Sequence, residues 1–276
     1  MNKHIVLSVL SSALAISIAA KASAAITIRV FASDAVEKPL REIGYRFEKQ
    51  HPNVKLHYEF AASGLFMASI IQGVPPDVFI SSSDHYQNEL INRAEINFPT
   101  TIAYSHLAAA EPCYNPAGSS RIGTITSGNL VAHLMNGNMR VGIASPVLSP
   151  AGRYTNDMFM AIDRTTPGAY RRIMSHTKEV MGPNLIIPYL TDAKTDIAIL
   201  YASQIAGMRR EGVCVSETRI PNKYNRKVTF SASILKPSAL RVVSETRKSV
   251  DAEYAGFLTS ATGQRVFKEW GFVPAT

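Results

Sequence analysis

The sequence is poor in cysteine and lacks the motifs of common catalytic and metal-binding sites. Only 2 of the 276 residues are cysteines, and they form no C-x-x-C or other metal-ligand spacing. The histidines are scattered without paired ligand spacing. A G-x-S-x-G nucleophile elbow and a phosphate-binding P-loop are both absent. We therefore expect a protein that is not an enzyme, that has no catalytic residues, and that holds no metal or other cofactor.

Long basic clusters and long apolar runs are missing as well. The formal net charge is +8, but the basic clusters are no longer than pairs such as Arg171-Arg172 and Arg209-Arg210, without interleaved aromatic residues. Such scattered charge is typical of a solvated surface, so we expect no nucleic-acid partner. The run from Ile5 to Ala20 carries no charged side chain, but it is shorter than the roughly 18 residues of a membrane-spanning helix.

The N-terminal segment has the order of a secretory signal peptide. Lys3 precedes the apolar run, and Ala22-Ser23-Ala24 supplies the small residues that signal peptidase requires. We expect residues 1–24 to be removed after Ala24 and the mature chain to enter the periplasm. In an oxidising compartment an isolated pair of cysteines favours a disulfide between Cys113 and Cys214, with two buried free thiols as the alternative.

The first part of the mature chain alternates between strand and helix patterns. Apolar residues alternate over 26–30 and 54–60, whereas they follow helical spacing over 36–47 and 65–72. A third strand is predicted at 77–80, after Pro75-Pro76. Strands that alternate with helices predict a mainly parallel sheet with helices on its faces, and ligands bind beyond the strand ends of such sheets.

Later segments extend this α/β pattern into a second lobe. They comprise a stretch that crosses between lobes, a strand–loop–helix unit, two further strands, and two terminal helices that separate near Gly263. They lie at residues 99–110, 140–158, 196–201, 228–235 and 250–267. We expect a ligand cleft between two lobes. Lobe I is predicted at 25–105 and 223–276, and lobe II at 106–222.

At three places a strand is followed by a turn of small or hydroxyl-bearing residues and then by a helix. These turns are Ser33, Ser63-Gly64 and Pro150-Ala151-Gly152. The first amides of a helix have no partner within the helix, and the helix dipole adds partial positive charge there. Small residues let an anion approach these amides, and a serine hydroxyl can donate one more hydrogen bond. Each turn alone is better explained as a plain helix cap, but the three together in an exported α/β protein shift the balance toward an oxyanion site.

Several strings of residues carry a family resemblance over essentially the whole mature chain. They are Val30–Ala35, Phe47–Val54, Phe60–Gly64, Gln72–Ser81, Ser149–Tyr154, Asp196–Tyr201 and Phe267–Phe272. They resemble the periplasmic molybdate-binding proteins of ABC transporters, most specifically at Gly73-Val74-Pro75-Pro76-Asp77-Val78-Phe79-Ile80-Ser81. The resemblance implies a two-lobed, type II-like binding protein. It also implies molybdate or tungstate as the ligand and an ABC transporter permease as the partner, and we expect a monomer.

The resemblance also implies particular ligand contacts between the lobes. Ser63 would donate its hydroxyl, Ala151 its backbone amide and Tyr201 its phenol. A further amide donor falls at Pro183-Asn184, and because proline has no N–H we assign this contact to Asn184.

The first turn departs from the family's pattern, which has a serine where this chain has Ala35. We hypothesise that Ser33 supplies the donor instead. We further hypothesise that Asp34 forms a capping box with Glu37 and turns its carboxylate away from the ligand. This departure leaves other ligands open, namely sulfate, a phosphorylated compound or a small organic acid. A surface adhesion or colonisation role on the same scaffold is the alternative from another functional class.

Overall fold

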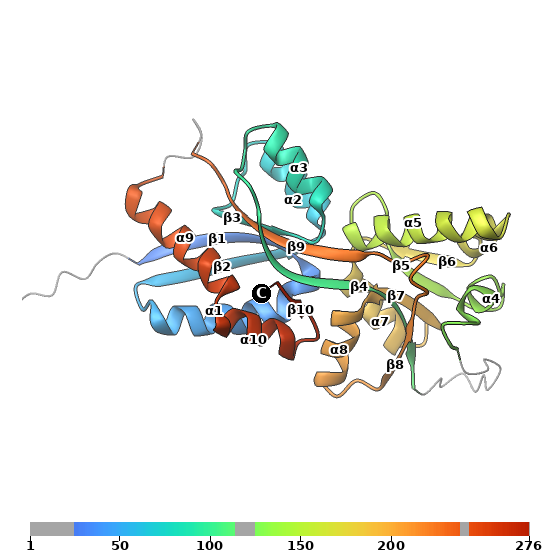
Figure 1. Cartoon of the computed structure of the whole chain (residues 1–276). Coiled ribbons are helices and arrows are strands. Elements are labelled where there is room, and N and C mark those ends of the chain that lie inside the picture. Colours follow the sequence, from blue (N-terminus) through green and yellow to red (C-terminus); the bar gives the residue numbers. More distant parts are fainter. Residues whose placement is uncertain (1–24, 114–124, 238–242, 276) are drawn as a thin grey trace, which may run out of the picture.

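The computed structural model describes residues 25–113, 125–237 and 243–275, so the predicted signal peptide lies outside the described residues. Within this part of the chain, ten strands are arranged in the order β2-β1-β3-β9-β4-β7-β5-β6, with β8 and β10 paired to β4. The strands and their helices form two α/β lobes, as Figure 1 shows. No helix in the described ranges is long and apolar enough to cross a membrane.

Lobe I is built on a sheet whose first three strands are parallel. β1 (Ile26–Ser33) pairs with β2 (Val54–Ala61) on one side and with β3 (Val78–Ser81) on the other. β9 (Lys227–Ile234) runs antiparallel to both β3 and the first half of β4 (Thr100–Pro112). The remaining elements of lobe I are η1 (Asp34–Val36), α1 (Glu37–Gln50), α2 (Ser63–Ile71), α3 (Asp84–Asn92), α9 (Glu245–Thr259), α10 (Ala261–Glu269) and β10 (Val273–Pro274).

Both faces of this sheet are buried, which explains why its strands are so apolar. Val30 of β1 packs in the main core with Leu40 of α1. The next residue, Phe31, points to the opposite face, where its ring stacks on Phe66 of α2 at 4.4 Å between centroids and shares a second core with Phe79 of β3. Figure 1 shows α2 and α3 over one face and α1 and α10 over the other. The sheet edge between these layers therefore positions the turns that follow β1, β2 and β3.

Lobe II repeats the same architecture on a smaller sheet. The second half of β4 pairs antiparallel with β7 (Ile197–Tyr201) and β8 (Val215–Arg219). β5 (Val141–Ala144) runs parallel to both β7 and β6 (Thr177–Val180). The helices of lobe II are α4 (Leu130–Leu134), α5 (Pro150–Thr165), α6 (Ala169–Met174), η2 (Pro183–Leu185), α7 (Ile186–Thr191) and α8 (Ala202–Arg210).

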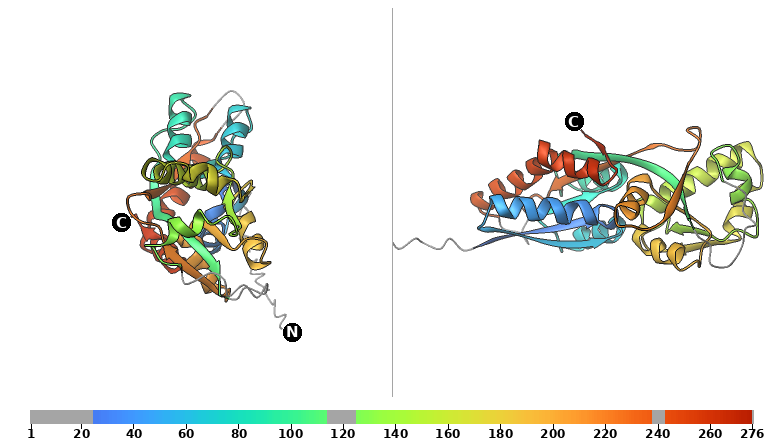
Figure 2. Two further views of the ribbon diagram at one scale, coloured as in Figure 1. Left: turned by 90° about the vertical axis from the view of Figure 1, so that its right-hand side faces the viewer. Right: turned by 90° about the horizontal axis from the view of Figure 1, so that it is seen from below.

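Two adjacent segments connect the lobes, as the view from below in Figure 2 shows. The first is β4, which pairs with β9 as far as His106 and with β7 from Leu107 onward. The second is the segment 220–226 between β8 and β9. Asn225 in this second segment is hydrogen-bonded to both backbone groups of Leu107, at 3.2 Å to its N–H and 2.8 Å to its carbonyl. The two crossings are therefore tied together at the strand that both sheets share.

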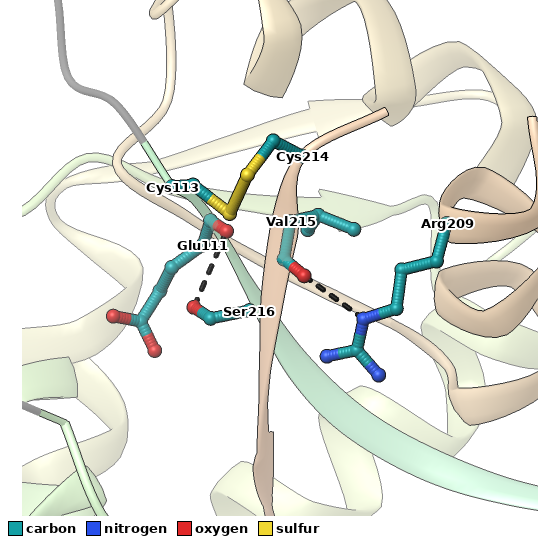
Figure 3. Close-up of a disulfide and its surroundings, with 6 residues drawn as sticks. All are labelled: Glu111, Cys113, Arg209, Cys214, Val215 and Ser216. Atoms are coloured by element: carbon teal, nitrogen blue, oxygen red, sulfur yellow. Dashed lines mark hydrogen bonds between the residues drawn. A yellow bond between two sulfur atoms is a disulfide. The ribbon is translucent and has the colours of Figure 1, made fainter. Parts of the chain in front are cut away.

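The predicted disulfide between Cys113 and Cys214 is present. Cys113 follows β4 and Cys214 precedes β8, and their Cα atoms are 5.3 Å apart, which is an ordinary spacing for a disulfide. The backbone N–H of Cys113 also donates to the carbonyl of Cys214 at 3.2 Å. Figure 3 shows the bridge beside the hydrogen bond from Ser216 to the Glu111 carbonyl, which joins the same two strands.

One predicted boundary is wrong. The two C-terminal helices separate at Ser260 rather than near Gly263, which lies inside α10. The Ser260 hydroxyl accepts the N–H of Gly263 at 3.2 Å and caps α10. A Cβ at position 263 would lie 2.6 Å from the carbonyl oxygen of Leu258, so this glycine permits close helix packing rather than a break. The strands predicted in the N-terminal part and at 196–201 and 228–235 are confirmed to within a few residues.

Candidate functional site

The N-termini of α2 and α5 meet between the two lobes. α2 begins at Ser63, and α5 begins at Pro150 after the capping residue Ser149. The backbone N–H of Gly64 donates to the carbonyl of Leu148 at 3.1 Å, which joins the two turns directly. A Cβ on residue 64 would lie 2.6 Å from that carbonyl oxygen, so only glycine fits here. Partial positive charge from two helices is thereby directed at one place.

Three buried hydroxyl groups without hydrogen-bond partners gather at this junction. Ser63 is 0% exposed, Ser149 1% and Tyr86 3%, and the side-chain oxygen of each has no partner among the described residues. Tyr86 belongs to the same cluster, because its hydroxyl would lie 3.0 Å from a Cβ built on Gly64. Burying an unpaired hydroxyl costs on the order of 1–3 kcal/mol. Three such groups beside two helix N-termini make this junction a candidate site for an anion.

A second group of hydroxyls lies around Ser82, in the turn between β3 and α3. The Tyr201 hydroxyl, at the end of β7, donates to Ser82 Oγ at 3.2 Å, and Ser33 Oγ lies 3.4 Å from the same atom. The Tyr154 hydroxyl of α5 donates to the Ser82 carbonyl at 3.2 Å. Ser82 therefore accepts hydrogen bonds from two tyrosines of lobe II, one at its hydroxyl and one at its carbonyl. It also lies beside Ser33, the serine that ends β1.

The tyrosines of this site keep their protons. Burial raises the pKa of Tyr201 well above its ordinary value, and the nearby Tyr154, Asp34 and Tyr86 raise it further, although the hydrogen bond to Ser82 opposes the change. Burial also raises the pKa of Tyr86, against the opposing effect of Arg153. The phenols can therefore donate hydrogen bonds to an anion throughout the physiological pH range.

Two guanidinium groups lie near the tyrosines of the site, and that of Arg226 is 5.3 Å from the centre of the Tyr154 ring. The guanidinium of Arg153, in the first turn of α5, is 6.0 Å from the centre of the Tyr86 ring. Arg153 therefore adds positive charge on the side where the two helix N-termini meet.

Asp34 of lobe I makes hydrogen bonds to lobe II and does not cap a helix. Its Oδ2 accepts the backbone N–H of Asn184 at 3.4 Å, and the Asn184 side chain donates to the Asp34 carbonyl at 2.8 Å. A Cβ on Gly182 would lie 2.5 Å from Asp34 Oδ2, so this glycine leaves room for the carboxylate. Glu37 pairs with Arg41, and neither η1 nor α1 has a side-chain cap, so the capping box predicted between Asp34 and Glu37 is wrong.

The Asp34 carboxylate has an unusual environment. Burial raises its pKa to about 6, with a further contribution from the nearby Glu37, while the backbone N–H groups of Asn184 and Ala35 oppose part of the change. Its Oδ1 is buried and has no hydrogen-bond partner among the described residues. The boundary between the lobes thus contains a buried acceptor as well as donors.

The structure places the predicted site residues along the boundary between the lobes. Ser33, Ser63 and Tyr201 reach the hydroxyl clusters described above. Ala151, buried at 1% exposure, is the second residue of α5, where backbone N–H groups have no partner within the helix. Asn184 is close to Asp34, and its side-chain oxygen accepts a hydrogen bond from Gln204 at 2.8 Å.

Four polar residues of this site were not predicted, namely Ser82, Tyr86, Ser149 and Tyr154. Ser82 could have been found, because Ser81-Ser82-Ser83 follows a strand and precedes a helix, which is the pattern that singled out Ser33. The tyrosines carry no comparable signal, since tyrosine on a helix is usually a packing residue. Within the described ranges, no group of three or more His, Cys, Asp or Glu side chains is arranged to hold a metal ion.

A pocket of about 280 Å³ opens between the lobes beside Asp34 and Asn184. Its lining is mostly apolar and includes Trp270, with the Lys38–Glu211 ion pair at 2.5 Å. It contains neither Ser63 nor Tyr201 in its lining. The free hydroxyls and helix N-termini lie elsewhere, so the hydroxyl clusters, and not this pocket, are the candidate anion site.

Comparison with known proteins agrees with this architecture. The chain is 24% identical over 250 residues to the molybdate-binding protein ModA of Escherichia coli K12, covering 89% of this chain and 88% of that protein. The periplasmic molybdate-binding protein of Azotobacter vinelandii superposes with a TM-score of 0.74 at 17% identity, covering 90% and 100% of the two chains. For the sulfate-binding protein SubI of Mycobacterium tuberculosis H37Rv the TM-score is 0.72 at 14% identity, covering 91% and 87%.

These structural likenesses show a shared two-lobed fold. The family model described as bacterial extracellular solute-binding protein matches residues 28–273, which is nearly all of the described chain. The protein therefore belongs to the bacterial extracellular solute-binding proteins.

Proposed function

We propose that this protein is the solute-binding component of an ABC transporter and that it captures a small tetrahedral oxyanion between its lobes. Members of its family bind solutes and are not enzymes. The observation that carries the proposal is the meeting of the α2 and α5 N-termini beside the unpartnered hydroxyls of Ser63, Tyr86 and Ser149. Such a site neutralises an anion with many neutral donors, so it selects by size and by the number of hydrogen bonds.

The two lobes already meet at this site through the Gly64–Leu148 and Tyr201–Ser82 hydrogen bonds, so the lobes would have to open to admit a ligand. Ser63 and Tyr86 come from lobe I, whereas Ser149, Ala151 and Tyr201 come from lobe II. A ligand that contacts both sets stabilises the closed form, and the two crossings at β4 and 220–226 are the segments about which the lobes would rotate. The closed form is the one that a membrane permease would receive.

Molybdate and tungstate are the first ligands to test, because proteins similar to this chain are named for molybdate binding. Sulfate also requires testing because of SubI, and phosphate completes the set of tetrahedral oxyanions. Isothermal titration of the purified mature chain with each anion should show tight binding of at least one. Failure of all of them would contradict the proposal and would favour the adhesion role or a small organic acid as the ligand.

We also propose that the chain acts in the periplasm as a monomer after removal of residues 1–24. Cell fractionation with N-terminal sequencing of the exported protein should give Ala25 as the first residue. Retention in the cytoplasmic fraction would contradict this part of the proposal.

A further inference from the structure

Two neighbouring pockets lie on either side of the second crossing between the lobes. One, of about 330 Å³, is lined by α5 and the segment 220–226, and the other, of about 320 Å³, by that segment, β4 and the adjoining ends of β8 and β9. Asn225 and Arg226 line both pockets, so the two hollows adjoin each other along the crossing. Together they form one concave surface, which we call the crossing groove.

The crossing groove is strongly basic. Five exposed cations line it, namely Arg164, Arg219, Lys223, Arg226 and Lys227. The described residues of the lining include one carboxylate, that of Asp157, and it pairs with Arg226 at 3.1 Å. The other four cations have no carboxylate partner within the part of the chain that the structure describes. The groove therefore carries positive charge that these residues do not neutralise.

Tyrosine rings order the two lysines of the groove. Lys227 Nζ lies 3.9 Å from the centre of the Tyr104 ring, and Lys223 Nζ lies 4.7 Å from that of Tyr224. A cation over an aromatic ring keeps its charge, and a side chain that is already ordered loses less freedom when a ligand binds. The two lysines therefore retain their charge in defined positions, which favours the binding of an anion.

The groove is separate from the candidate anion site. Tyr154 lies between them, because its ring is 5.3 Å from the Arg226 guanidinium while its hydroxyl donates to the Ser82 carbonyl at 3.2 Å. The unpartnered hydroxyls of the anion site belong to residues that do not line the groove, namely Ser63, Tyr86 and Ser149. The two places also differ in chemistry, because the anion site offers mainly neutral donors whereas the groove offers full positive charges.

Several full charges on one concave surface match a ligand that itself carries several negative charges. A single tetrahedral anion would contact only part of the groove, so the remaining cations would still repel one another. A chain of phosphates presents negative charge at each successive phosphorus, and both lysine and arginine bind phosphate oxygens. The concave shape favours a small ligand over a flat membrane surface.

We propose that the crossing groove is a second anion site, which binds a small molecule with two or more linked phosphate groups. Arg164 and Lys223 serve the phosphate beside α5. Arg219 and Lys227 serve the phosphate beside β4, and Arg226 lies where the two pockets meet. Inorganic polyphosphate and the phosphates of a nucleotide share this chemistry, and titration with each distinguishes them.

Isothermal titration of the mature chain with tripolyphosphate in about 0.15 M salt tests the proposal, because distant surface charges are largely screened there. The main variant carries Lys223→Gln and Lys227→Gln together, one from each pocket. We expect its affinity to fall about tenfold or more, since each exposed ion pair contributes up to roughly fivefold. Arg226 is left unchanged because it also pairs with Asp157. Adenosine triphosphate, inorganic phosphate and citrate are titrated in parallel.

Two control variants make the result specific. Lys178→Gln removes an exposed lysine of the edge strand β6 that lies 6.0 Å from the centre of the Tyr189 ring, so it matches the loss of charge outside the groove. Ser63→Ala alters the candidate anion site instead. Both variants should bind tripolyphosphate as the wild type does. Thermal unfolding identifies any variant that fails to fold, and the single changes Lys223→Gln and Lys227→Gln then replace the double variant.

An affinity for adenosine triphosphate that equals or falls below that for tripolyphosphate would identify the phosphate chain as the ligand, and tighter binding would identify a nucleotide. The inference is overturned if neither binds, if citrate binds as tightly as tripolyphosphate, or if the double variant loses no affinity. It is also overturned if Ser63→Ala weakens tripolyphosphate, because the polyanion would then occupy the candidate anion site. None of these results decides the oxyanion-binding function, which depends on the titrations with small tetrahedral anions.

Discussion

The hydroxyl of Tyr201 in lobe II donates a hydrogen bond to Oγ of Ser82 in lobe I at 3.2 Å. Both residues are fully buried, and each stands at the end of a strand that points to the lobe boundary. The bond therefore links the two sheets through the residues that would meet the ligand.

Removal of single donors should weaken oxyanion binding without unfolding the protein. Ser63→Ala and Tyr201→Phe each leave one oxygen of a buried anion unpaired, which costs about 1.5–3 kcal/mol, or roughly 10- to 100-fold in affinity. Titration of the preferred anion measures the loss. Ser69→Ala is a matched control, because this serine of α2 donates only within its own helix, to the Leu65 carbonyl. Unchanged affinity in both donor variants would place the ligand elsewhere.

Ser33 tests the first turn separately. We expect Ser33→Ala to lower affinity by about tenfold if its hydroxyl turns from Ser82 to the ligand. Ser82→Ala should have a comparable effect, because Ser82 holds both Ser33 and Tyr201 in place. If Ser33→Ala binds as the wild type does while Ser63→Ala does not, the first turn has only a structural role.

Gly64→Ala should prevent the lobes from closing fully. The added methyl would lie 2.6 Å from the Leu148 carbonyl oxygen, so we expect the affinity for the anion to fall at least tenfold, which corresponds to about 1.4 kcal/mol. The ligand-free chain should also lose stability, because the close contact between residue 64 and the Leu148 carbonyl is present without a ligand. Small-angle scattering with and without ligand would detect the loss of closure. Gly256→Ala in α9, where nothing lies within 4 Å of the added Cβ, should close normally.

Reduction of the disulfide should destabilise the protein. Cys113 and Cys214 are separated by 101 residues, and closing a loop of that size stabilises a chain by about 4 kcal/mol in the chain-entropy model. Urea denaturation with and without a thiol reductant measures the difference. The double variant with both cysteines changed to serine should not respond to the reductant. A native exported protein with two alkylatable thiols would contradict the assignment.

The stability of the ligand-free protein should depend on pH through Asp34. Its pKa rises from 3.8 to about 6 on folding, so the folded state favours the neutral carboxyl group. This stabilisation is fully present below pH 3.8 and is lost as the pH rises through about 6, by up to about 3 kcal/mol at 1.36 kcal/mol per pKa unit.

Asp34→Asn isolates this contribution. The variant should be more stable than the wild type at pH 7.5 and should approach it at pH 4, because only the wild type has to bury a charge at the higher pH. Chemical denaturation at the two pH values measures both differences. A constant difference between the two proteins would show that Asp34 does not titrate in this range.

Much of the fold could be predicted from the sequence, because its buried strands and amphipathic helices have distinct periodicities. Residues 54–60 alternate and lie in β2, and the apolar residues of 36–47 lie on the buried face of α1. The position of the terminal helix break could not be read in this way. Glycine often interrupts helices, so Gly263 suggested a break between two helices. Its role depends instead on close contact with Leu258, which only the packed structure shows.

The site was predictable only where its residues follow a local pattern. Ser63 and Ala151 were proposed because both follow a strand in the sequence, and the structure places both at helix N-termini, although their contact with a ligand stays a prediction. The position of the Asp34 carboxylate could not be predicted, because its partner Asn184 is 150 residues away in sequence. The local sequence suggested a helix cap, but Asp34 contacts Asn184 instead. Gly182 leaves room for the carboxylate in this position.

The sharing of β4 between two sheets determines how the protein can move. Because the strand passes from one sheet to the other between His106 and Leu107 without an intervening loop, the first crossing between the lobes is a continuous hydrogen-bonded strand, whereas the second crossing at 220–226 is not a strand. Rotation of one lobe must then appear as torsion of this strand, and Asn225 fixes the pivot at Leu107. The register of β4 in the two sheets therefore constrains the angle between the lobes, together with the second crossing at 220–226.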